Sequence, residues 1–484
     1  MTRSKSALLI IVFTAAAMLC LADSSPLINI SRSDSSVFIT AGRAMLSEKV
    51  MYRDIFDHKG LYIFLVNCIA AMIDAKSLIG VWLLETLFML ANAFIVMKIY
   101  QQVFAESDNV ISSQVLVLCV LFPLVFEGGN LTEEYTLPFQ FLSIYLLVKY
   151  INSGEVKHSP LIMLIHGINA GIALNFRPNH VLMWVPIALI MSCSLIYNKE
   201  YANLIKNFLA GLAGLALGVM PVVIYAIVNG VLYDVIFWTF ICNFMYINTS
   251  ETSFIYRVFN IVFHMREMII IVALLLSCLV VIFHDKFRRY RLYYLLMIIA
   301  GVTAVSLSGR RYGHYYIYLM PLLLPVIFVI AGYVSRIKLA GKLQTLITFV
   351  LILYCSFMAV TGHKPLSSTA RKVFDDFPVI NTENKRVLVT GNRAAYYVKF
   401  GIIPREKYYF LPSLQYDKFP EPVDSQAESI LSNVNDMIFY TGGSDARFAQ
   451  TGRLDLIHET LAKNYDLLMT HNDTKIYGKK NLLP

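Results

Sequence analysis

Residues 31–60, SRSDSSVFITAGRAMLSEKVMYRDIFDHKG, decide the fold of this 484-residue chain. This stretch is polar and densely charged, whereas long apolar runs flank it on both sides. Asp34 precedes a segment in which apolar residues gather on one side between positions 37 and 46. That pattern predicts a helix lying along a membrane surface, in a loop outside the lipid.

The composition places the remainder of the chain in a bilayer. Hydrophobic residues make up 57% of the sequence and charged residues 15%, with a mean hydropathy of +0.60. Soluble domains carry roughly 25% charged residues. The chain therefore cannot be a soluble enzyme, a disordered tail or a disulfide scaffold, because so much apolar surface needs lipid to cover it. A mainly helical, polytopic membrane protein is expected.

The net charge of +9 indicates membrane topology rather than nucleic-acid binding, because the basic residues are scattered in short loops between apolar runs. The cysteines are read as small core residues. The seven cysteines lie mostly inside apolar runs, at positions 20, 68, 119, 193, 242, 278 and 355. Because none follows Cys355, the polar tail has no disulfide.

About eleven apolar runs are long enough to be transmembrane helices. They cover residues 7–22, 78–98, 110–126, 137–151, 160–176, 180–197, 207–228, 266–283, 291–308, 315–334 and 343–361. The basic start MTRSKS predicts a cytoplasmic N-terminus. We expect the first run to be an uncleaved anchor rather than a signal peptide, because LADSSPLINI offers a poor cleavage site.

The run 61–74 is too short for a comfortable span and suits an interfacial or re-entrant helix. If it does not cross, the loops rich in Lys and Arg all become cytoplasmic, as the positive-inside rule requires. The segments predicted to lie outside the cytoplasm are 23–77, 127–136, 177–179, 229–265, 309–314 and the tail after about residue 362.

Two domains are expected: a transmembrane catalytic module at 1–361, with the first outer loop at 23–77, and an extracytoplasmic α/β domain at 362–484. In the tail, RVLVTG (386–391) and DMIFYTG (436–442) read as buried strands. Segments near 392–400, 424–434 and 453–465 read as helices, and the end reads as a strand–turn–strand. The glycines do not fit G-x-G-x-x-G, so no nucleotide site is inferred.

The first outer loop carries the leading catalytic candidate. A carboxylate at a helix start, just outside the lipid, suits a general base or a metal ligand, and Asp34 has that position. The alternative is that Ser33 or Asp34 simply caps the helix.

YRDIFDHKG contributes five more candidates: Arg53, Asp54, Asp57, His58 and Lys59. They form either a solvated interfacial turn or a polar site. In the second case Arg53 or Lys59 would neutralise a phosphate, while Asp57 and His58 would bind a divalent cation or orient the acceptor. The metal candidates are thus Asp34, Asp57 and His58.

Further candidates come from three other outer segments. GGNLTEEY puts Glu133 and Glu134 at a helix end, where one of them is expected to face the site; the alternative is a favourable acidic first turn. Arg177 occupies a tight turn in NFRPNH. SGRRYGHYY supplies residues that either clamp a lipid-linked phosphate and stack on a sugar or only reach toward headgroups: Arg310, Arg311, His314 and Tyr315.

These strings and their order resemble the GT-C superfamily of integral-membrane glycosyltransferases. DSSVF, YRDIFDHKG, GGNLTEEY, NFRPNH and SGRRYGHYY are similar to the bacterial dolichyl-phosphate-mannose-protein-mannosyltransferase-like and lipid A aminoarabinose transferase-like branch. The likeness covers roughly residues 1–340. The first loop has DSS where many mannosyltransferases have an Asp-Glu pair, and the second acidic position is Glu-Glu rather than a lone Asp.

The resemblance implies an inverting hexosyl- or pentosyltransferase that uses a polyprenyl-phosphate-linked sugar. The family's catalytic Asp maps onto Asp34, and its second acid maps onto Glu133 or Glu134. The implied cofactor is a divalent cation (Mg²⁺ or Mn²⁺) or none. The implied partners are the lipid donor, membrane lipids and an extracytoplasmic glycan, lipid or protein acceptor, with no nucleic acid. The implied location is the bacterial plasma membrane.

Three other functions compete with this one. A lipid-linked oligosaccharide flippase would show inverted repeats and broken helices at mid-membrane, and neither is found in the sequence. An O-antigen polymerase or ligase would place its large outer loop late in the chain, whereas the charged loop here comes first. A receptor domain on an anchor would not need about eleven spans.

Overall fold

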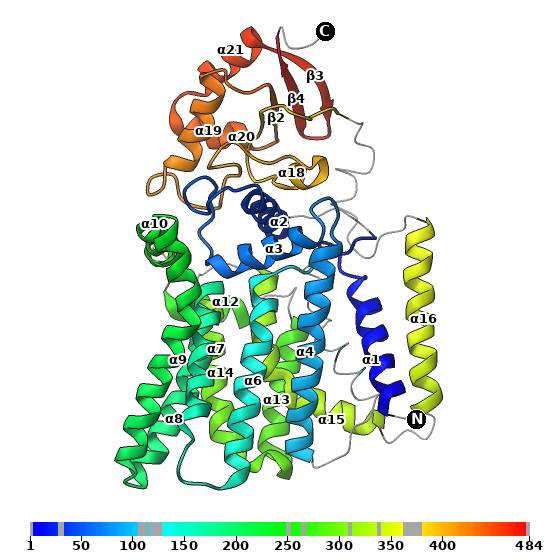
Figure 1. Ribbon diagram of the computed structural model, residues 1–484, viewed down its shortest axis with the longest axis vertical. Coiled ribbons are helices and arrows are strands. Elements are labelled where there is room, and N and C mark those ends of the chain that lie inside the picture. The colour runs from blue at the N-terminus through cyan, green and yellow to red at the C-terminus, as the bar shows by residue number, and fades with distance from the viewer. Residues whose placement is uncertain are drawn as a thin grey trace.

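A computed structural model describes residues 3–27, 33–104, 114, 117, 128–247, 253–262, 268–307, 312–335, 340–361 and 380–480. A bundle of upright helices occupies one end of the molecule, and an α/β segment occupies the other (Figure 1). Two short helices of the first loop lie between them. The predominantly helical architecture agrees with the prediction.

Helices form at the apolar runs, with boundaries that differ by several residues. The run 110–126 lies outside the described residues, apart from positions 114 and 117. The bundle elements are α1 (Arg3–Met18), α4 (Ile79–Phe104), α6 (Thr132–Ser153), α7 (Pro160–Phe176), η1 (Pro178–Met183), α8 (Trp184–Tyr197), α9 (Tyr201–Val228), α10 (Leu232–Ile236), η2 (Phe237–Ile241), α11 (Cys242–Ile247), α12 (Phe254–Val262), α13 (Met268–Phe283), η4 (Asp285–Tyr290), α14 (Arg291–Ser306), η5 (Gly313–Leu323), α15 (Leu324–Ser335) and α16 (Ala340–Thr361).

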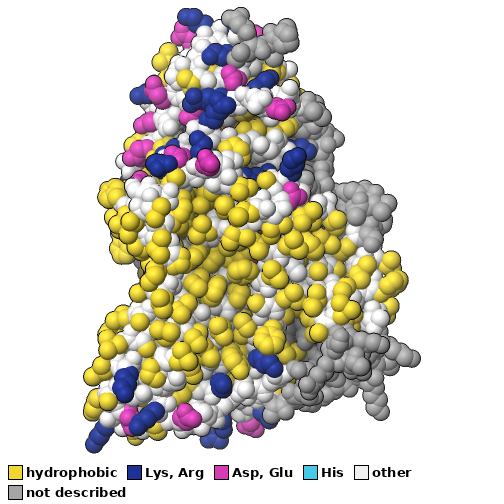
Figure 2. All heavy atoms as spheres, viewed as in Figure 1, with side chains coloured by type: hydrophobic (Ala, Val, Ile, Leu, Met, Phe, Trp, Pro, Cys, Tyr) yellow, Lys and Arg dark blue, Asp and Glu magenta, His cyan; other side chains and the backbone are white. Residues whose placement is uncertain are grey.

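On the face shown in Figure 2, hydrophobic side chains form a belt over the bundle, with charged side chains at its lower end and over the α/β segment. In the described part of the chain, four helices are each long and apolar enough to cross a membrane: Ile79–Phe104, Pro178–Tyr197, Tyr201–Val228 and Gly313–Tyr333. Ile270–Phe283 and Asp285–Ser306, bent by 100°, make a fifth if they count as one span. The chain is a membrane protein, while the number of about eleven spans stays a prediction.

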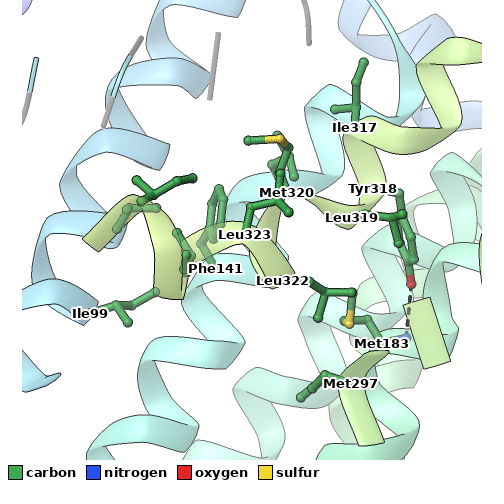
Figure 3. Packing of buried hydrophobic residues seen from close by; sticks show 14 of the residues in the cluster. Ile99, Phe141, Met183, Met297, Ile317, Tyr318, Leu319, Met320, Leu322 and Leu323 are labelled. Atoms are coloured by element: carbon green, nitrogen blue, oxygen red, sulfur yellow. Dashed lines mark hydrogen bonds between the residues drawn. The ribbon is translucent and has the colours of Figure 1, made fainter. Parts of the chain in front are cut away.

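The interior of the bundle is a close-packed apolar core (Figure 3). Ile99, Phe141 and Met297 come from three different helices and meet around η5. Within this core the backbone N–H of Met183 donates to the hydroxyl of Tyr318 at 3.1 Å, which fixes η5 against η1.

Helices α7 and α9 approach closely because glycines line their contact. A Cβ on Gly214 would lie 2.1 Å from the carbonyl oxygen of Leu164, and one on Gly167 would lie 2.2 Å from that of Gly211. Small residues at such spacing let two helices pack backbone to backbone in a membrane. This contact fixes the end of α7, from which Arg177 projects.

The first outer loop forms α2 (Ser33–Leu46) and α3 (Leu61–Ile73), which pack against each other. Because α3 has 13 residues, it is about 20 Å long, shorter than the roughly 30 Å of hydrocarbon in a bilayer. It lies across the end of the bundle rather than along it (Figure 1).

The C-terminal segment contains a four-stranded sheet in the order β1-β2-β4-β3. Its elements are β1 (Val387–Val389), α18 (Ala395–Phe400), α19 (Glu421–Leu431), β2 (Met437–Tyr440), α20 (Ser444–Phe448), η6 (Ala449–Thr451), α21 (Leu454–Asn464), β3 (Tyr465–His471) and β4 (Thr474–Lys479). β1 and β2 are parallel, and the other neighbours are antiparallel. The end of the chain forms the predicted strand–turn–strand, and its turn between β3 and β4 uses Asn472 at φ +51°.

This segment packs directly on the first loop. A guanidinium nitrogen of Arg43 in α2 donates to the carbonyl oxygen of Val398 at 3.1 Å. The hydroxyl of Tyr409 donates to the carbonyl oxygen of Val37, also in α2, at 2.9 Å. The rings of Phe56 and Tyr408 lie 4.8 Å apart. The first loop is therefore enclosed between the bundle and the C-terminal segment.

Candidate functional site

Asp34 lies in the first turn of α2 and forms an ion pair with the first loop's lysine. A carboxylate oxygen of Asp34 is 3.2 Å from Nζ of Lys59, and the same Nζ is 3.9 Å from Asp57. Asp57 is fully buried, whereas the Asp34 side chain is 35% exposed. One ammonium group therefore lies between a buried and an accessible carboxylate.

The segment that carries Lys59 is held in place by hydrogen bonds to its backbone carbonyl groups. Tyr52 adopts φ +73°, and its hydroxyl donates to the carbonyl oxygen of Lys59 at 2.7 Å. The side-chain amide of Asn243 donates to the carbonyl oxygen of His58 at 2.7 Å. The backbone N–H of His58 donates to Asp57 at 2.6 Å, and its Nδ1 lies 3.2 Å from the same oxygen.

The electrostatics keep these groups charged. Burial by itself would raise the pKa of Asp34, but the Lys59 ammonium and the nearby His314 outweigh it and hold the pKa below its usual value. Burial also opposes ionisation of Asp57, and Lys59 again outweighs it, so the pKa of Asp57 is lowered. For Lys59, burial would lower the pKa, but the two carboxylates raise it.

Glu133, in the first turn of α6, forms the second ion pair. Its carboxylate is 2.5 Å from the guanidinium of Arg177 and 3.8 Å from Nε2 of His180. Glu133 and His180 are each 1% exposed, and Arg177 is 17% exposed. Arg177 reaches this position because α7 ends at Phe176 and the chain turns before Pro178.

Aromatic rings line the same pair. The guanidinium carbon of Arg177 lies 4.1 Å from the ring centroid of Tyr315, a cation–π distance. The ring of His180 stacks on Tyr318 at 4.9 Å, and His314 lies edge-to-face on Tyr315 at 4.7 Å. Burial opposes the charge on Arg177, but Tyr315 and Glu133 outweigh it and raise its pKa.

The two ion pairs belong to one cluster. Arg177 is close enough to Lys59 for its like charge to lower the pKa of the lysine. The same His314 acts electrostatically on Asp34 and on Glu133. Three acids, two cations and three histidines from separate parts of the chain thus converge beneath the C-terminal segment: Asp34, Asp57, Glu133, Lys59, Arg177, His58, His180 and His314.

Glu134 points elsewhere. Its carboxyl group faces that of Glu85 in α4 at hydrogen-bonding distance, and both side chains are buried. The backbone N–H of Asn130 donates to the Glu85 carboxylate. Adjacent residues project about 100° apart on a helix, which is why one acid joins the cluster and the other enters the bundle.

The structure does not bring every predicted residue into the cluster. Arg53 is half exposed and pairs with Asp54 at the surface, with 3.1 Å between the charged atoms. Asp54 also accepts the backbone N–H of Val50, so these two residues stabilise a turn. The phosphate role of Arg53 stays a prediction; in the structure its guanidinium pairs with Asp54 outside the cluster. Arg310 and Arg311 lie outside the described residues.

The predicted metal ligands do not fit a metal ion. Asp34 and Asp57 share the ammonium of Lys59, which lies where a divalent cation would have to bind. Among the residues that the structure describes, no group of three or more His, Cys, Asp or Glu side chains is arranged to hold a metal. The mechanism proposed below therefore assigns no step to a metal.

Two residues near the site were not identified from the sequence. His180 lies three residues after Arg177 in NFRPNH, and this closeness to a candidate arginine was the only sequence signal for it. Asn130 is a buried hub: its side-chain amide donates to Ser35 and Asn67 at 3.0 Å, and its oxygen accepts from the hydroxyl of Tyr135 at 3.1 Å. A buried asparagine after two glycines carries no chemical signature of its own.

Solved structures share this architecture. ArnT from Cupriavidus metallidurans, in a crystal structure bound to undecaprenyl phosphate, is similar at a TM-score of 0.59 with 10% identity, over 99% of this chain and 98% of that one. Its apo form gives 0.57 with 12% identity over 97% and 96%. An oligosaccharyltransferase from Archaeoglobus fulgidus, in complex with Zn and sulfate, gives 0.49 with 12% identity over 97% and 73%.

The chain therefore has the same fold as ArnT, the GT-C fold that the sequence resemblance implied. A family model described as "Putative competence-induced protein Ccs4 N-terminal domain" matches residues 2–345, and the chain belongs to that family. No curated protein sequence matches the chain.

Proposed function

We propose that the protein is an inverting glycosyltransferase that moves a sugar from a polyprenyl-phosphate-linked donor to an acceptor outside the cytoplasm. One observation carries the proposal: an accessible, ionised carboxylate, Asp34, lies beside the ammonium of Lys59, and Arg177 is close to that lysine, where the polar cluster meets the apolar bundle. The ArnT structure with bound undecaprenyl phosphate supports a lipid phosphate as the donor group.

Asp34 is the better candidate for the base than Glu133. The Asp34 side chain is 35% exposed and can receive a proton from an acceptor hydroxyl. Glu133 is 1% exposed, and Arg177 and His180 occupy its carboxylate. We assign Glu133 the role of orienting Arg177, because a buried carboxylate fixes a guanidinium through charge-assisted hydrogen bonds.

In the proposed reaction, the acceptor hydroxyl transfers its proton to Asp34 while its oxygen attacks the anomeric carbon. The bond from that carbon to the phosphate oxygen breaks, and the phosphate keeps the electron pair. Protonation cancels the charge on Asp34, so the Lys59 ammonium can then interact with the leaving phosphate. Attack opposite the departing phosphate inverts the anomeric configuration.

The setting of the site supports a lipid-linked donor. Asp34 lies on a helix across the end of the bundle, and the hydrophobic belt lies below it (Figures 1 and 2). A polyprenyl tail can stay in the bilayer while its phosphate meets Lys59 and Arg177. The loops predicted to be cytoplasmic include the one with Lys157, between α6 and α7, and the basic one between α13 and α14, with Lys286, Arg288, Arg289 and Arg291. Both lie at the opposite end from the C-terminal segment (Figure 1). We therefore place the site and that segment outside the plasma membrane.

Transfer from radiolabelled undecaprenyl-phosphate hexoses and pentoses to a cell-envelope fraction tests the proposal. We expect Asp34→Asn to lower the rate by about 10²–10⁴-fold, the usual contribution of a positioned base. Binding of undecaprenyl phosphate should remain, because Lys59 and Arg177 are unchanged. The matched control is Asp473→Asn, which removes an exposed carboxylate paired with Arg393.

A wild-type rate in Asp34→Asn would remove Asp34 from the mechanism. In a second outcome, the wild-type protein binds these donors and carries them across a vesicle membrane without transferring sugar from any of them. That result would indicate a transporter instead.

A further inference from the structure

Cys20 and Cys355 are far apart in sequence but lie together in the fold. Cys20 lies two residues beyond the end of α1, and Cys355 lies in the C-terminal half of α16. Both thiols donate to the same carbonyl oxygen, that of Ala16, at 3.9 Å for Cys20 and 3.2 Å for Cys355. The two thiols therefore lie beside each other at one carbonyl oxygen.

The other described cysteines are distributed over separate elements. Cys68 is on α3, Cys193 on α8, Cys242 on α11 and Cys278 on α13. Cys119 lies outside the described residues. The neighbouring thiols of Cys20 and Cys355 therefore differ from cysteines that merely fill space in an apolar core.

The pair marks the contact between the first and last helices of the bundle. Helix α16 stands at the edge of the bundle beside α1 (Figure 1). The contact consists of small and medium side chains: Ala16 and Cys355, with Leu19, Cys20, Leu27 and Leu351 around them. A covalent bond at this contact would constrain how α16 packs on α1.

Cys20 is also connected to the site through the backbone that follows it. The backbone N–H of Asp23 donates to the carbonyl oxygen of Gly128 at 2.7 Å. The hydroxyl of Ser35 donates to the carbonyl oxygen of Asp23 at 3.0 Å. Ser35 is the neighbour of Asp34 on α2. A bond at Cys20 would therefore fix the chain three residues before a support of the Asp34 helix.

We propose that Cys20 and Cys355 form a disulfide bond that joins α1 to α16. The oxidant is a disulfide, either of a low-molecular-weight thiol or of a thiol–disulfide carrier protein. One cysteine thiolate attacks the oxidant and releases its first thiol; the other then attacks the mixed disulfide and releases the second. Two cysteine thiols are oxidised, one disulfide is reduced, and two protons pass to the released thiols.

Access and location favour this reaction. Cys20 is partly exposed, which gives the oxidant an entry point, whereas Cys355 is 6% exposed. Helix α1 ends toward the bundle end that carries the C-terminal segment (Figure 1), and Cys20 lies two residues beyond that helix. In the orientation proposed above, that end faces the oxidising side of the membrane, where disulfides persist.

The test uses the purified full-length protein with glutathione disulfide as the oxidant. Free thiols are then blocked with N-ethylmaleimide, and the digested protein is analysed by mass spectrometry. We expect two of the seven thiols to escape alkylation and one peptide to link Cys20 to Cys355. Cys20→Ser and Cys355→Ser should each abolish the linked peptide and leave the remaining thiol alkylated or joined to glutathione.

Cys193→Ser is the matched control, because it removes an exposed cysteine on α8 and should keep the linked peptide. As a second measurement, oxidation should raise the Tm of the wild type and of Cys193→Ser but not that of either pair variant. Recovery of Cys20 and Cys355 on separate alkylated peptides, while Cys193 reacts with the oxidant, would overturn the proposal. Neither readout depends on sugar transfer, so the outcome is independent of the proposed function.

Discussion

At the scale of single residues, the two acids to which we assign roles in the reaction have different surroundings. Asp34 is accessible and shares Lys59 with the buried Asp57, whereas Glu133 is enclosed by Arg177 and His180. An accessible acid can exchange a proton with a substrate, and an enclosed one can only orient its partner. Exposure therefore separates their roles.

Lys59 should control the pH at which the base becomes protonated. The pKa of Asp34 is lowered, so its ionised form persists until the pH falls below the ordinary Asp value of 3.8. Activity from a general base is present above its pKa and is lost as the pH falls through it. In Lys59→Met the burial of Asp34 is no longer outweighed, so the acid limb of kcat/KM should move to higher pH.

The measurement is a pH profile of transfer, with Lys49→Met as the control for removing a lysine after α2. Lys59→Met also lowers the rate, because it removes a phosphate contact, but the position of the limb is the diagnostic quantity. An acid limb at the same pH in both variants and in the wild type would contradict the role of Lys59.

The two neighbouring glutamates should behave differently. Glu133→Gln leaves the Arg177 guanidinium, 17% exposed, without its carboxylate, so kcat/KM should fall by about tenfold or more. Glu134→Gln places an amide opposite the Glu85 carboxyl group, to which it can donate a hydrogen bond. Its kcat/KM should stay within about threefold of the wild type. Steady-state kinetics on both variants check this, and equal losses would show that the two acids act together.

At the scale of elements, the turn before α6 positions Glu133 through unusual backbone angles. Gly128, Gly129 and Asn130 have successive positive φ values of 97°, 90° and 55°. A Cβ on Gly129 would lie 2.8 Å from both the Glu85 carboxylate and the hydroxyl of Ser24. The turn therefore needs glycine for its conformation and for space.

Gly129→Ala should destabilise the protein by about 1–3 kcal/mol and reduce transfer, since strain and crowding both act at the start of α6. Gly154→Ala is the matched control: its φ is +66°, but no heavy atom lies within 4 Å of the added Cβ, so it carries only the conformational cost. Thermal unfolding in detergent measures both variants. A cost for Gly129→Ala no greater than that for Gly154→Ala would show that crowding is unimportant.

Periodicity explains which elements could be predicted. The strands Val387–Val389 and Met437–Tyr440 and the hairpin at Asn472 were evident because short buried runs ending in turn residues have a local signature. The number of about eleven spans stays a prediction, because described helices such as Pro160–Phe176 and Ala7–Met18 are shorter than a full crossing and η5 is a 3₁₀ helix. Bilayer thickness alone does not decide how such helices are placed.

At the scale of the molecule, the sequence identified most of the charged residues but not their pairing. Asp34, Lys59, Glu133, Arg177 and His314 were all candidates, because charge beside a membrane is costly and thus noticeable. Partner choice depends on tertiary packing: it joined Arg53 to Asp54 at the surface and sent Glu134 toward Glu85. His180 and Asn130 act through contacts that no local pattern records.

The C-terminal segment and the first loop share one hydrophobic core. Phe56 and Phe64 from the loop and Tyr396, Tyr409 and Phe410 from the segment belong to the same buried cluster, together with residues of α9 and α10. Burying an aromatic side chain contributes about 1.5–3 kcal/mol, so separating the two parts would expose a large apolar surface. The segment should therefore act as the lid of the site rather than as an independent receptor domain.

We expect the full-length protein to unfold in a single thermal transition, because a shared core couples the two parts. Tyr409→Ala removes a fully buried ring and the hydrogen bond to Val37. It should lower the free energy of unfolding by about 3 kcal/mol or more and shift the single transition to lower temperature without splitting it. Leu468→Ala, at a site 40% exposed on β3, should leave the transition nearly unchanged. Calorimetry checks both variants. Two resolved transitions in the wild type, or a Tyr409→Ala effect confined to one of them, would mean that the C-terminal segment folds alone, and the receptor-domain interpretation would regain support.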